Sequence, residues 1–286
     1  MTVDIDPGAG FCPGVVRAIS KAEAVLENED AVFCLGEIVH NPQEVKRLRN
    51  KGVLMIRHKD LPSSGNVLIR AHGEPPETYR VLRQHENISL IEGTCPVVMR
   101  LQQRIRKAHT EMKPLHGQVV IFGKKDHPEV IGLQGFASNQ AIVVSDEQDV
   151  VRINPRAPVR FFSQTTMDPG DYQRMENRIR EHLQDDIGKN LVVYDSICKV
   201  VRNRVEDLRR FAAGHDVIIF VSGKNSSNGR YLYSVSKNVN PRTYLVESPG
   251  ALTATHTKNA RSIGISGATS TPQWLLEEMA EKIKSS

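Results

Sequence analysis

Three stretches of this chain share one pattern: a short apolar run, a cysteine, and a segment with the apolar spacing of an amphipathic helix. The cysteines are Cys12, Cys95 and Cys198, in the stretches GFCPGVVRAI, IEGTCPVVMR and SICKVVRNRV. The runs VDID, ISLIE and LVVYDSI predict the strands before them, and the helical spacing predicts the helices after them. We therefore expect each cysteine at the carboxyl end of a strand, where open α/β sheets bind ligands, and beside a helix N-terminus.

The segments after each cysteine correspond as well, which indicates a threefold internal repeat. Each cysteine is followed by a second and a third strand–loop corner that end in polar residues. At 28, 32 and 27–30 residues after the cysteines, the second corners contain His40, His127 and residues 225–228. At 60, 70 and 72 residues, the third corners contain His72, Thr165 and Ser270. Prolines soon after the third corners predict further helix starts.

The repeat predicts three α/β units, spanning residues 1–92, 93–194 and 195–286, the last with a C-terminal helix. Three such units around a pseudo-threefold axis would bring their cysteines and polar residues into one central cavity. The sequence shows the repeat, and the convergence on one axis is inferred from it.

The spacing of the cysteines limits the kinds of metal site that they can form. The chain has no C-x-x-C pair, which argues against a zinc ribbon or a thioredoxin-type site. Zinc held by three cysteines and a histidine stays open, but three widely separated thiolates suit a cubane iron–sulfur cluster better. Three cysteines would hold three of its irons, and a fourth, non-cysteine ligand also stays open. Cys34, in the strand-like run AVFCLG, has no counterpart in the repeat, and we expect it in the core.

Hydrogen-bond donors are expected around this centre, as a phosphate or diphosphate ligand requires. They are His40, His72, Ser226, Ser227, Asn228 and Ser270. The chain has neither a P-loop nor a G-x-G-x-x-G fingerprint. Glu129, in the stretch DHPEV, follows His127 by two residues, and we expect both on the same side of an extended segment.

Charge and composition exclude other classes of protein. The net charge is +5, but Lys and Arg are spread along the expected helices among Glu and Asp and show no interleaving with aromatic residues, so nucleic acid is not an expected partner. No apolar run reaches the length of a membrane span, and no secretory signal is visible at the N-terminus. We expect a cytoplasmic protein without membrane partners, whose thiols stay reduced.

With these residues assembled, the chain closely resembles the IspH (LytB) family of 4-hydroxy-3-methylbut-2-enyl diphosphate reductases over essentially its whole length. The motifs that show the resemblance, in the family's order, are GFCPGVVRAI, EIVHNPQEV, RAHGEPPE, TCPVV, DHPEVIG, SQTT, SICKVVRNR, GKNSSN and GATSTP. Three departures are EGTCP, where family members often have Asp-Ala before Thr-Cys-Pro, the two lysines before DHPE, and Cys34. None of them removes a matched functional residue.

The resemblance implies a trefoil of three α/β domains around a [4Fe–4S] cluster held by Cys12, Cys95 and Cys198. It implies reductive removal of the substrate's hydroxyl to give isopentenyl and dimethylallyl diphosphates, the last step of the non-mevalonate isoprenoid route. Electrons would come from a reduced ferredoxin or a flavodoxin-type donor.

The resemblance also assigns roles residue by residue. The positions that match the family's diphosphate-binding residues are His40, His72, His127, Ser226, Ser227, Asn228 and Ser270. Thr165 would lie near the substrate hydroxyl, and Glu129 would be the proton donor, with His127 or the diphosphate itself as the alternative donor. A non-catalytic iron–sulfur redox sensor on the same fold would need the cysteines but not Glu129 or the hydroxyl groups. A zinc hydrolase is the third function that stays open.

Overall fold

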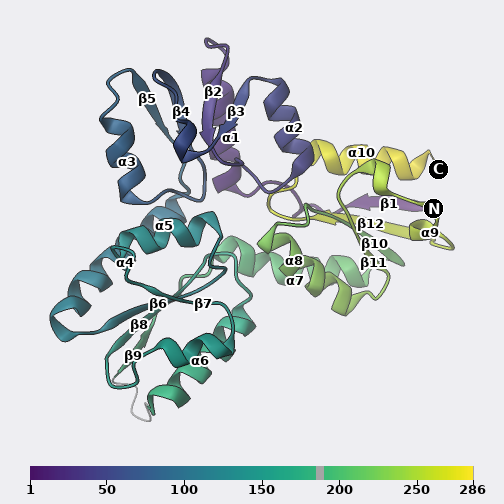
Figure 1. The fold of residues 1–286 in the computed structure, drawn as a ribbon. Helices are drawn as coiled ribbons and strands as arrows, with labels where there is room; N and C mark the ends of the chain where they lie inside the picture. Colours follow the sequence, from purple (N-terminus) through teal and green to yellow (C-terminus); the bar gives the residue numbers. More distant parts are fainter. Residues whose placement is uncertain (185–189, 286) are drawn as a thin grey trace. The chain divides into compact units, whose positions relative to one another are not determined.

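The computed structural model describes residues 1–184 and 190–285, whose fold is drawn in Figure 1. The chain divides into two compact units, the first formed by residues 1–56 and 199–286 and the second by residues 57–198. The first unit therefore contains both ends of the chain. Within the described ranges, no helix combines the length and the apolar composition that are needed to cross a bilayer.

The first unit alternates strands with helices. In chain order its elements are β1 (Thr2–Ile5), α1 (Pro13–Val25), β2 (Val32–Leu35), α2 (Pro42–Asn50), β3 (Val53–Ile56), α7 (Lys199–Ala213), β10 (Val217–Val221), α8 (Ser227–Val239), β11 (Thr243–Val246), α9 (Ala254–Thr257), β12 (Ser262–Gly267) and α10 (Gln273–Lys284). The predicted C-terminal helix is thus α10. Helices α1 and α2 begin with proline, whose fixed φ and missing N–H suit the first helical position.

The second unit has the same alternation. Its elements are β4 (Gly65–Ile69), α3 (Pro76–Arg83), β5 (Ile88–Glu92), α4 (Pro96–Met112), β6 (Gln118–Phe122), α5 (Pro128–Phe136), β7 (Ile142–Val144), β8 (Val159–Ser163), α6 (Pro169–Leu183) and β9 (Leu191–Val193). Short 3₁₀ segments of three to six residues lie between some of them. Helices α3, α4, α5 and α6 all begin with proline.

The described strands form three four-stranded sheets that share one strand order. The orders are β3-β2-β4-β5, β7-β6-β8-β9 and β11-β10-β12-β1. The paired strands are parallel, as helical crossovers require. The predicted α/β class with a repeated sheet is therefore confirmed. In each sheet the strand that precedes a cysteine (β5, β9 or β1) lies at an edge.

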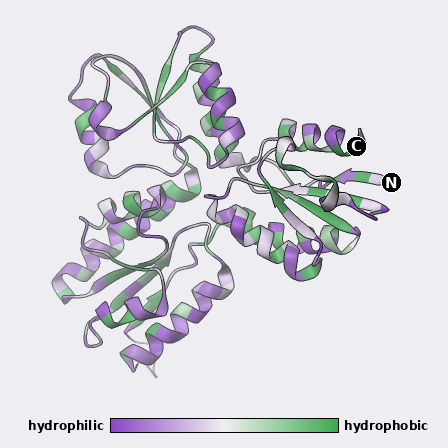
Figure 2. Cartoon of the chain, turned by 45° about the vertical axis from the view of Figure 1, so that its right-hand side comes forward, coloured by the Kyte–Doolittle hydropathy of each residue, from purple (hydrophilic) through white to green (hydrophobic). Residues whose placement is uncertain are grey.

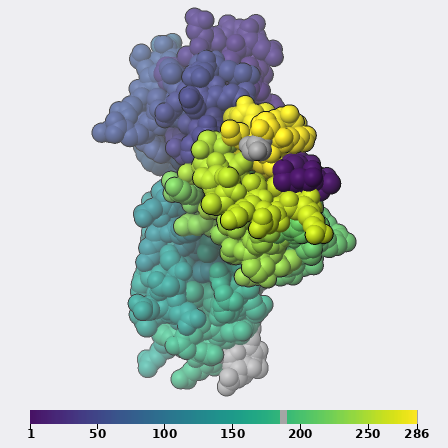
Figure 3. Space-filling view, turned by 90° about the vertical axis from the view of Figure 1, so that its right-hand side faces the viewer, coloured from purple at the N-terminus to yellow at the C-terminus, as the bar shows by residue number. Residues whose placement is uncertain are grey.

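Strand β1 differs from the sequence-based expectation. It pairs with β12, with Thr2 opposite Ser262, whereas the sequence places it at the start of the first predicted unit (Figure 1). In Figure 3 the N-terminal residues, in dark purple, lie beside the yellow C-terminal residues. Strand β1 thus completes the sheet formed by the last part of the chain, while the predicted boundaries at 92/93 and 194/195 stay a prediction.

Strand β10 has buried apolar side chains on both faces, as expected of a parallel strand covered by helices. In β10, Ile219 packs in one cluster with Leu275 of α10, and Phe220 packs in another with Leu208 of α7. Figure 2 shows strands that are largely hydrophobic, and helices in which hydrophilic and hydrophobic residues alternate. Each large side chain that is fully buried in this way contributes about 1.5–3 kcal/mol to folding.

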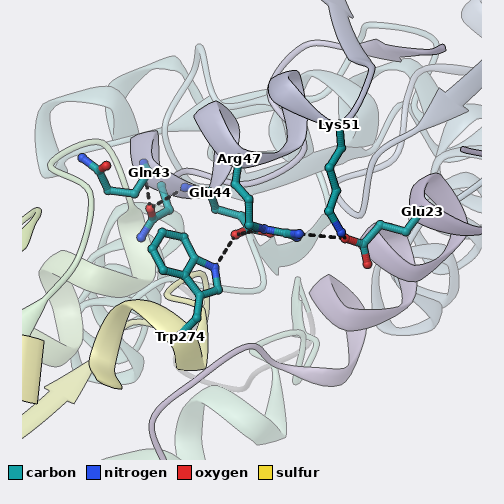
Figure 4. Close-up of polar contacts among 7 residues, drawn as sticks. Glu23, Gln43, Glu44, Arg47, Lys51 and Trp274 are labelled. Atoms are coloured by element: carbon teal, nitrogen blue, oxygen red, sulfur yellow. Dashed lines mark hydrogen bonds and ion pairs between the residues drawn. The ribbon is translucent and has the colours of Figure 1, made fainter. Parts of the chain in front are cut away.

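A partly buried polar network holds α2 against α10 and α1 in the first unit (Figure 4). The indole N–H of Trp274 donates to the carboxylate of Glu44 at 2.8 Å, and Arg47 Nε donates to the same oxygen at 2.9 Å. Arg47 also donates to Glu23 of α1 at 2.8 Å. Glu44 is fully buried, and these bonds hold the first turn of α2, which begins at Pro42, two residues after His40.

Candidate active site

The three predicted cysteine ligands occupy equivalent local positions. Cys12 and Cys95 are the N-cap residues of α1 and α4, and Cys198 directly precedes α7. All three are partly buried, and neither Cys12 nor Cys95 uses its sulfur to cap its helix in the described structure. A helix N-terminus stabilises a thiolate, so these corners suit thiolate ligands. Cys34 is fully buried in β2, as predicted.

One hydrogen bond recurs at all three corners. The backbone N–H groups of the cysteines donate at 3.1, 3.0 and 2.8 Å to the carbonyl oxygens of Thr269, Ala71 and Thr165, for Cys12, Cys95 and Cys198 respectively. Each acceptor lies two residues after the end of β12, β4 or β8. The turn after the third strand therefore holds the loop that contains the cysteine.

This bond corrects the register of the predicted repeat. Thr165 corresponds to Ala71 and Thr269, so its predicted alignment with His72 and Ser270 is wrong by one residue. Thr166 is the residue that lies three positions after its strand, as His72 and Ser270 do. Counting residues from each cysteine does not reveal this equivalence, because the helices and loops in between differ in length among the repeats. Counting from the end of each third strand does reveal it.

Glu129 and Thr165 form a buried pair in the second unit. Glu129 Oε1 accepts a hydrogen bond from the backbone N–H of Thr165 at 2.7 Å, and Oε2 accepts one from its hydroxyl at 2.8 Å. Burial raises the pKa of the Glu129 carboxyl to about 7, although the two hydrogen bonds lower it. A carboxyl with this pKa can hold and release a proton near neutral pH.

His127 caps α5, and the expectation of an extended segment around it is wrong. Pro128 starts the helix, so Glu129 lies in its first turn. Nδ1 of His127 accepts a hydrogen bond from the Glu129 backbone N–H at 3.2 Å, so a neutral ring has its proton on Nε2. The His127 ring also meets His72 edge-on, with centroids 5.3 Å apart. Two predicted anion-binding imidazoles thus lie together beside the start of α5.

In the first unit, hydroxyl and amide groups gather at the start of α8. Ser226 caps this helix, and its Oγ lies 3.3 Å from Ser270 Oγ. Asn228 Oδ1 accepts hydrogen bonds from the backbone N–H and the hydroxyl of Thr269, both at 2.9 Å. Ser227 and Asn228 are both buried. The Asn228 side-chain nitrogen is buried and has no hydrogen-bond partner among the described residues.

The chain around His40 approaches this loop closely. A Cβ on Gly223 would lie 2.5 Å from the His40 carbonyl oxygen, so the contact requires glycine. Asn41, which the sequence analysis did not single out, caps α2 by accepting hydrogen bonds from the backbone N–H groups of Gln43 and Glu44 at 3.1 and 3.2 Å. Its buried side-chain nitrogen has no partner in the part of the chain that the structure describes. An asparagine directly before proline in EIVHNPQEV is a helix-start signal that could have found it.

The predicted site residues thus fall into two groups. The second unit holds Cys95, Cys198, His72, His127, Glu129 and Thr165, and the first holds Cys12, His40, Ser226, Ser227, Asn228 and Ser270. The side chains of the second unit include a buried acid near two imidazoles. Those of the first unit include hydroxyl and amide donors, which suit an anion.

Two proteins named 4-hydroxy-3-methylbut-2-enyl diphosphate reductase are similar to this chain over full length. That of Bacteroides fragilis is 45% identical over 284 residues, which cover 99% of this chain and 97% of the relative. That of Chlorobium luteolum is 40% identical over 326 residues, which cover 100% and 99%.

Solved structures agree with the sequence relatives. The structure of (E)-4-hydroxy-3-methyl-but-2-enyl diphosphate reductase aligns with a TM-score of 0.74 at 34% identity and covers all of both chains. The E-1-hydroxy-2-methyl-but-2-enyl-4-diphosphate reductase of Plasmodium falciparum aligns with a TM-score of 0.85 at 25% identity, over 98% of this chain and 87% of that one. The family described as LytB protein matches residues 3–284. This chain therefore belongs to the LytB protein family.

Proposed function

We propose that this chain is a 4-hydroxy-3-methylbut-2-enyl diphosphate reductase that catalyses the last step of the non-mevalonate isoprenoid route. The reaction consumes two electrons and two protons, breaks the allylic C–O bond, and releases water with isopentenyl or dimethylallyl diphosphate. Full-length similarity to reductases of that name supports the proposal. The main structural support is the buried Glu129 carboxyl, whose pKa is about 7. It accepts a hydrogen bond from the Thr165 N–H, and the Thr165 carbonyl accepts one from the Cys198 N–H.

Cys12, Cys95 and Cys198 are the proposed ligands of a [4Fe–4S] cluster, which when bound would transfer the two electrons, one at a time, from an external donor to the substrate. These three residues fit such a cluster, because their thiols are partly buried and lie at helix N-termini. In each case the cysteine N–H donates the same backbone hydrogen bond to the turn after the third strand. The proposal requires the cysteine of the first unit to join the two cysteines of the second.

The diphosphate is proposed to bind the seven residues that the resemblance assigns to it, His40, His72, His127, Ser226, Ser227, Asn228 and Ser270. A buried donor without an acceptor costs about 1–3 kcal/mol. The amide nitrogens of Asn41 and Asn228 bear such a cost in the first unit, and a bound anion would offset it.

Glu129 is the proposed source of the proton that leaves with the hydroxyl. When protonated, its carboxyl can donate to Thr165 Oγ1, and the threonine can pass its own proton to the departing oxygen. Burial of both residues keeps bulk water away from this path. The second proton, which ends on an allylic carbon, is assigned to the diphosphate or to His127.

The proposal extends to the electron donor and the compartment. A reduced ferredoxin or a flavodoxin-type protein would deliver the electrons in the cytoplasm, where cysteine ligands stay reduced. A redox sensor on this fold would have no use for the buried Glu129–Thr165 pair or the donors at the start of α8. No observation on the described residues favours that alternative.

An anaerobic assay with dithionite, a viologen dye and the substrate tests the proposal. We expect dye oxidation coupled to formation of the two isoprenoid diphosphates. A protein that contains the cluster and exchanges electrons with the dye but forms no product would be a sensor. Zinc in place of iron and sulfide would indicate a hydrolase.

A further inference from the structure

Thr269 binds Asn228 through two hydrogen bonds that determine which way its side-chain amide points. Both the backbone N–H and the hydroxyl of Thr269 donate to Asn228 Oδ1, each at 2.9 Å. If the amide turned over, its NH₂ group would face two donors and both bonds would be lost. The position of Nδ2 is therefore set by Thr269.

The amide nitrogen that results is a buried donor that lacks an acceptor. Asn228 is 4% exposed, and Nδ2 has no hydrogen-bond partner within the described ranges. Ser270, the next residue after Thr269, is within 3.3 Å of the Ser226 hydroxyl. The same turn therefore positions one amide and one hydroxyl donor at the start of α8.

The second unit contains the same arrangement with an acid in place of the amide. Glu129 is the second residue of α5, as Asn228 is of α8, and it accepts hydrogen bonds from the backbone N–H and the hydroxyl of Thr165. Thr165 and Thr269 each lie two residues after their strand, and each accepts a hydrogen bond from a cysteine N–H. At the corresponding positions of the remaining repeat the sequence has Gln43 and Ala71, and Ala71 lacks a hydroxyl.

We infer that Thr269 is a positioning residue for diphosphate binding, which acts by holding the Asn228 amide with its nitrogen toward the ligand. The inference rests on the proposed function. In the second unit the threonine holds a group that exchanges a proton. In the first unit it holds a donor that keeps its hydrogens at every pH, which suits an anion that must stay bound throughout the reaction.

The test measures binding of inorganic diphosphate to the cluster-containing protein by calorimetry. Thr269→Val removes the hydroxyl with little change of shape, and we expect binding about tenfold weaker, or about 1.4 kcal/mol. Thr269→Ser restores a hydroxyl and should bind within about twofold of the wild type. Thr271→Val is the matched control, because the Thr271 hydroxyl in the same turn donates to the Val221 carbonyl at 2.7 Å and not to Asn228. It should lower stability and leave diphosphate binding unchanged.

A double-mutant cycle separates positioning from a general loss of structure. In an Asn228→Ala background, Thr269→Val should change binding less than about twofold, since the group that it orients is gone. Additive losses, or an equal loss in Thr271→Val, would overturn the inference. Thr269→Ala replaces Thr269→Val in the cycle if the valine variant does not fold. Reductase activity is assayed on the wild type: its absence overturns the proposed function, while an additive cycle in an active protein overturns only the inference.

Discussion

Glu129 shows how much one residue's role depends on contacts that are distant in sequence. The DHPEV stretch predicts a carboxyl beside a histidine, but its pKa of about 7 depends on burial and on Thr165, which comes from the turn after β8. The sequence identified Thr165 through the repeat and Glu129 through its position two residues after His127. It could not show that they touch, and it aligned Thr165 one position away from its structural equivalents because loop lengths differ between the repeats.

Glu129→Gln should bind substrate and hold the cluster, yet turn over about 10²–10⁴-fold more slowly. Glutamine keeps the size of the side chain and an oxygen for the Thr165 N–H, but it cannot deliver a proton. Single-turnover product formation measures the step, and iron content with substrate titration provides the control. Near-normal turnover would assign the proton to His127 or to the diphosphate.

The pH dependence should show the same group. Because burial raises the Glu129 pKa to about 7, turnover should fall as pH rises through that value and the donor loses its proton. The folded pKa lies above the ordinary value of 4.5, so this group's contribution to stability is full below pH 4.5 and is lost as pH rises toward 7. Comparison with Glu129→Gln isolates both effects, since that variant should lack the basic limb of the rate profile. A limb that persists in the variant would belong to another group.

At the scale of elements, local signals predicted the types of strand and helix better than their partners. Apolar runs before the cysteines correctly marked β5 and β9, the helical spacing after Cys95 marked α4, and the proline after the third corner marked α6. The pairing of β1 with β12 could not be predicted from local sequence. The alternating polar and apolar residues of VDID would suit the edge of any of the three sheets. The Glu44–Trp274 bond that ties α2 to α10 was equally invisible, since it joins residues from opposite ends of the chain.

Trp274→Phe should lower the free energy of unfolding by about 2 kcal/mol, because it removes a hydrogen bond to a buried carboxylate. Urea unfolding followed by circular dichroism measures this change, because Trp274 is the chain's one tryptophan and its fluorescence is lost in the variant. Gln273→Ala is the control, because among the described residues its side chain donates a hydrogen bond to Glu277 on the same exposed helix face, and the change should cost less than about 0.5 kcal/mol. Equal losses in both variants would mean that the network in Figure 4 does not stabilise α2.

At the scale of the whole molecule, the repeat relates three cysteines that come from distant parts of the sequence. Their equivalence rests on the shared strand order and on one backbone hydrogen bond per corner. Cys34 has neither feature and lies fully buried within β2. The four cysteines therefore separate into three proposed ligands and one core residue, and substitutions should separate them in the same way.

Single Cys→Ser changes at Cys12, Cys95 and Cys198 should each remove most of the iron, the sulfide and the brown colour of anaerobically purified protein. A hydroxyl is a poor replacement for a soft thiolate, and two remaining ligands hold a cluster weakly. Cys34→Ala should keep cluster and activity, at a cost of about 1 kcal/mol of stability for the lost sulfur packing. Iron and sulfide analysis of all four variants, with circular dichroism to verify folding, decides the assignment. A folded Cys34→Ala protein without iron would contradict it, and so would a full cluster in any of the three serine variants, because the repeat assigns every corner one ligand.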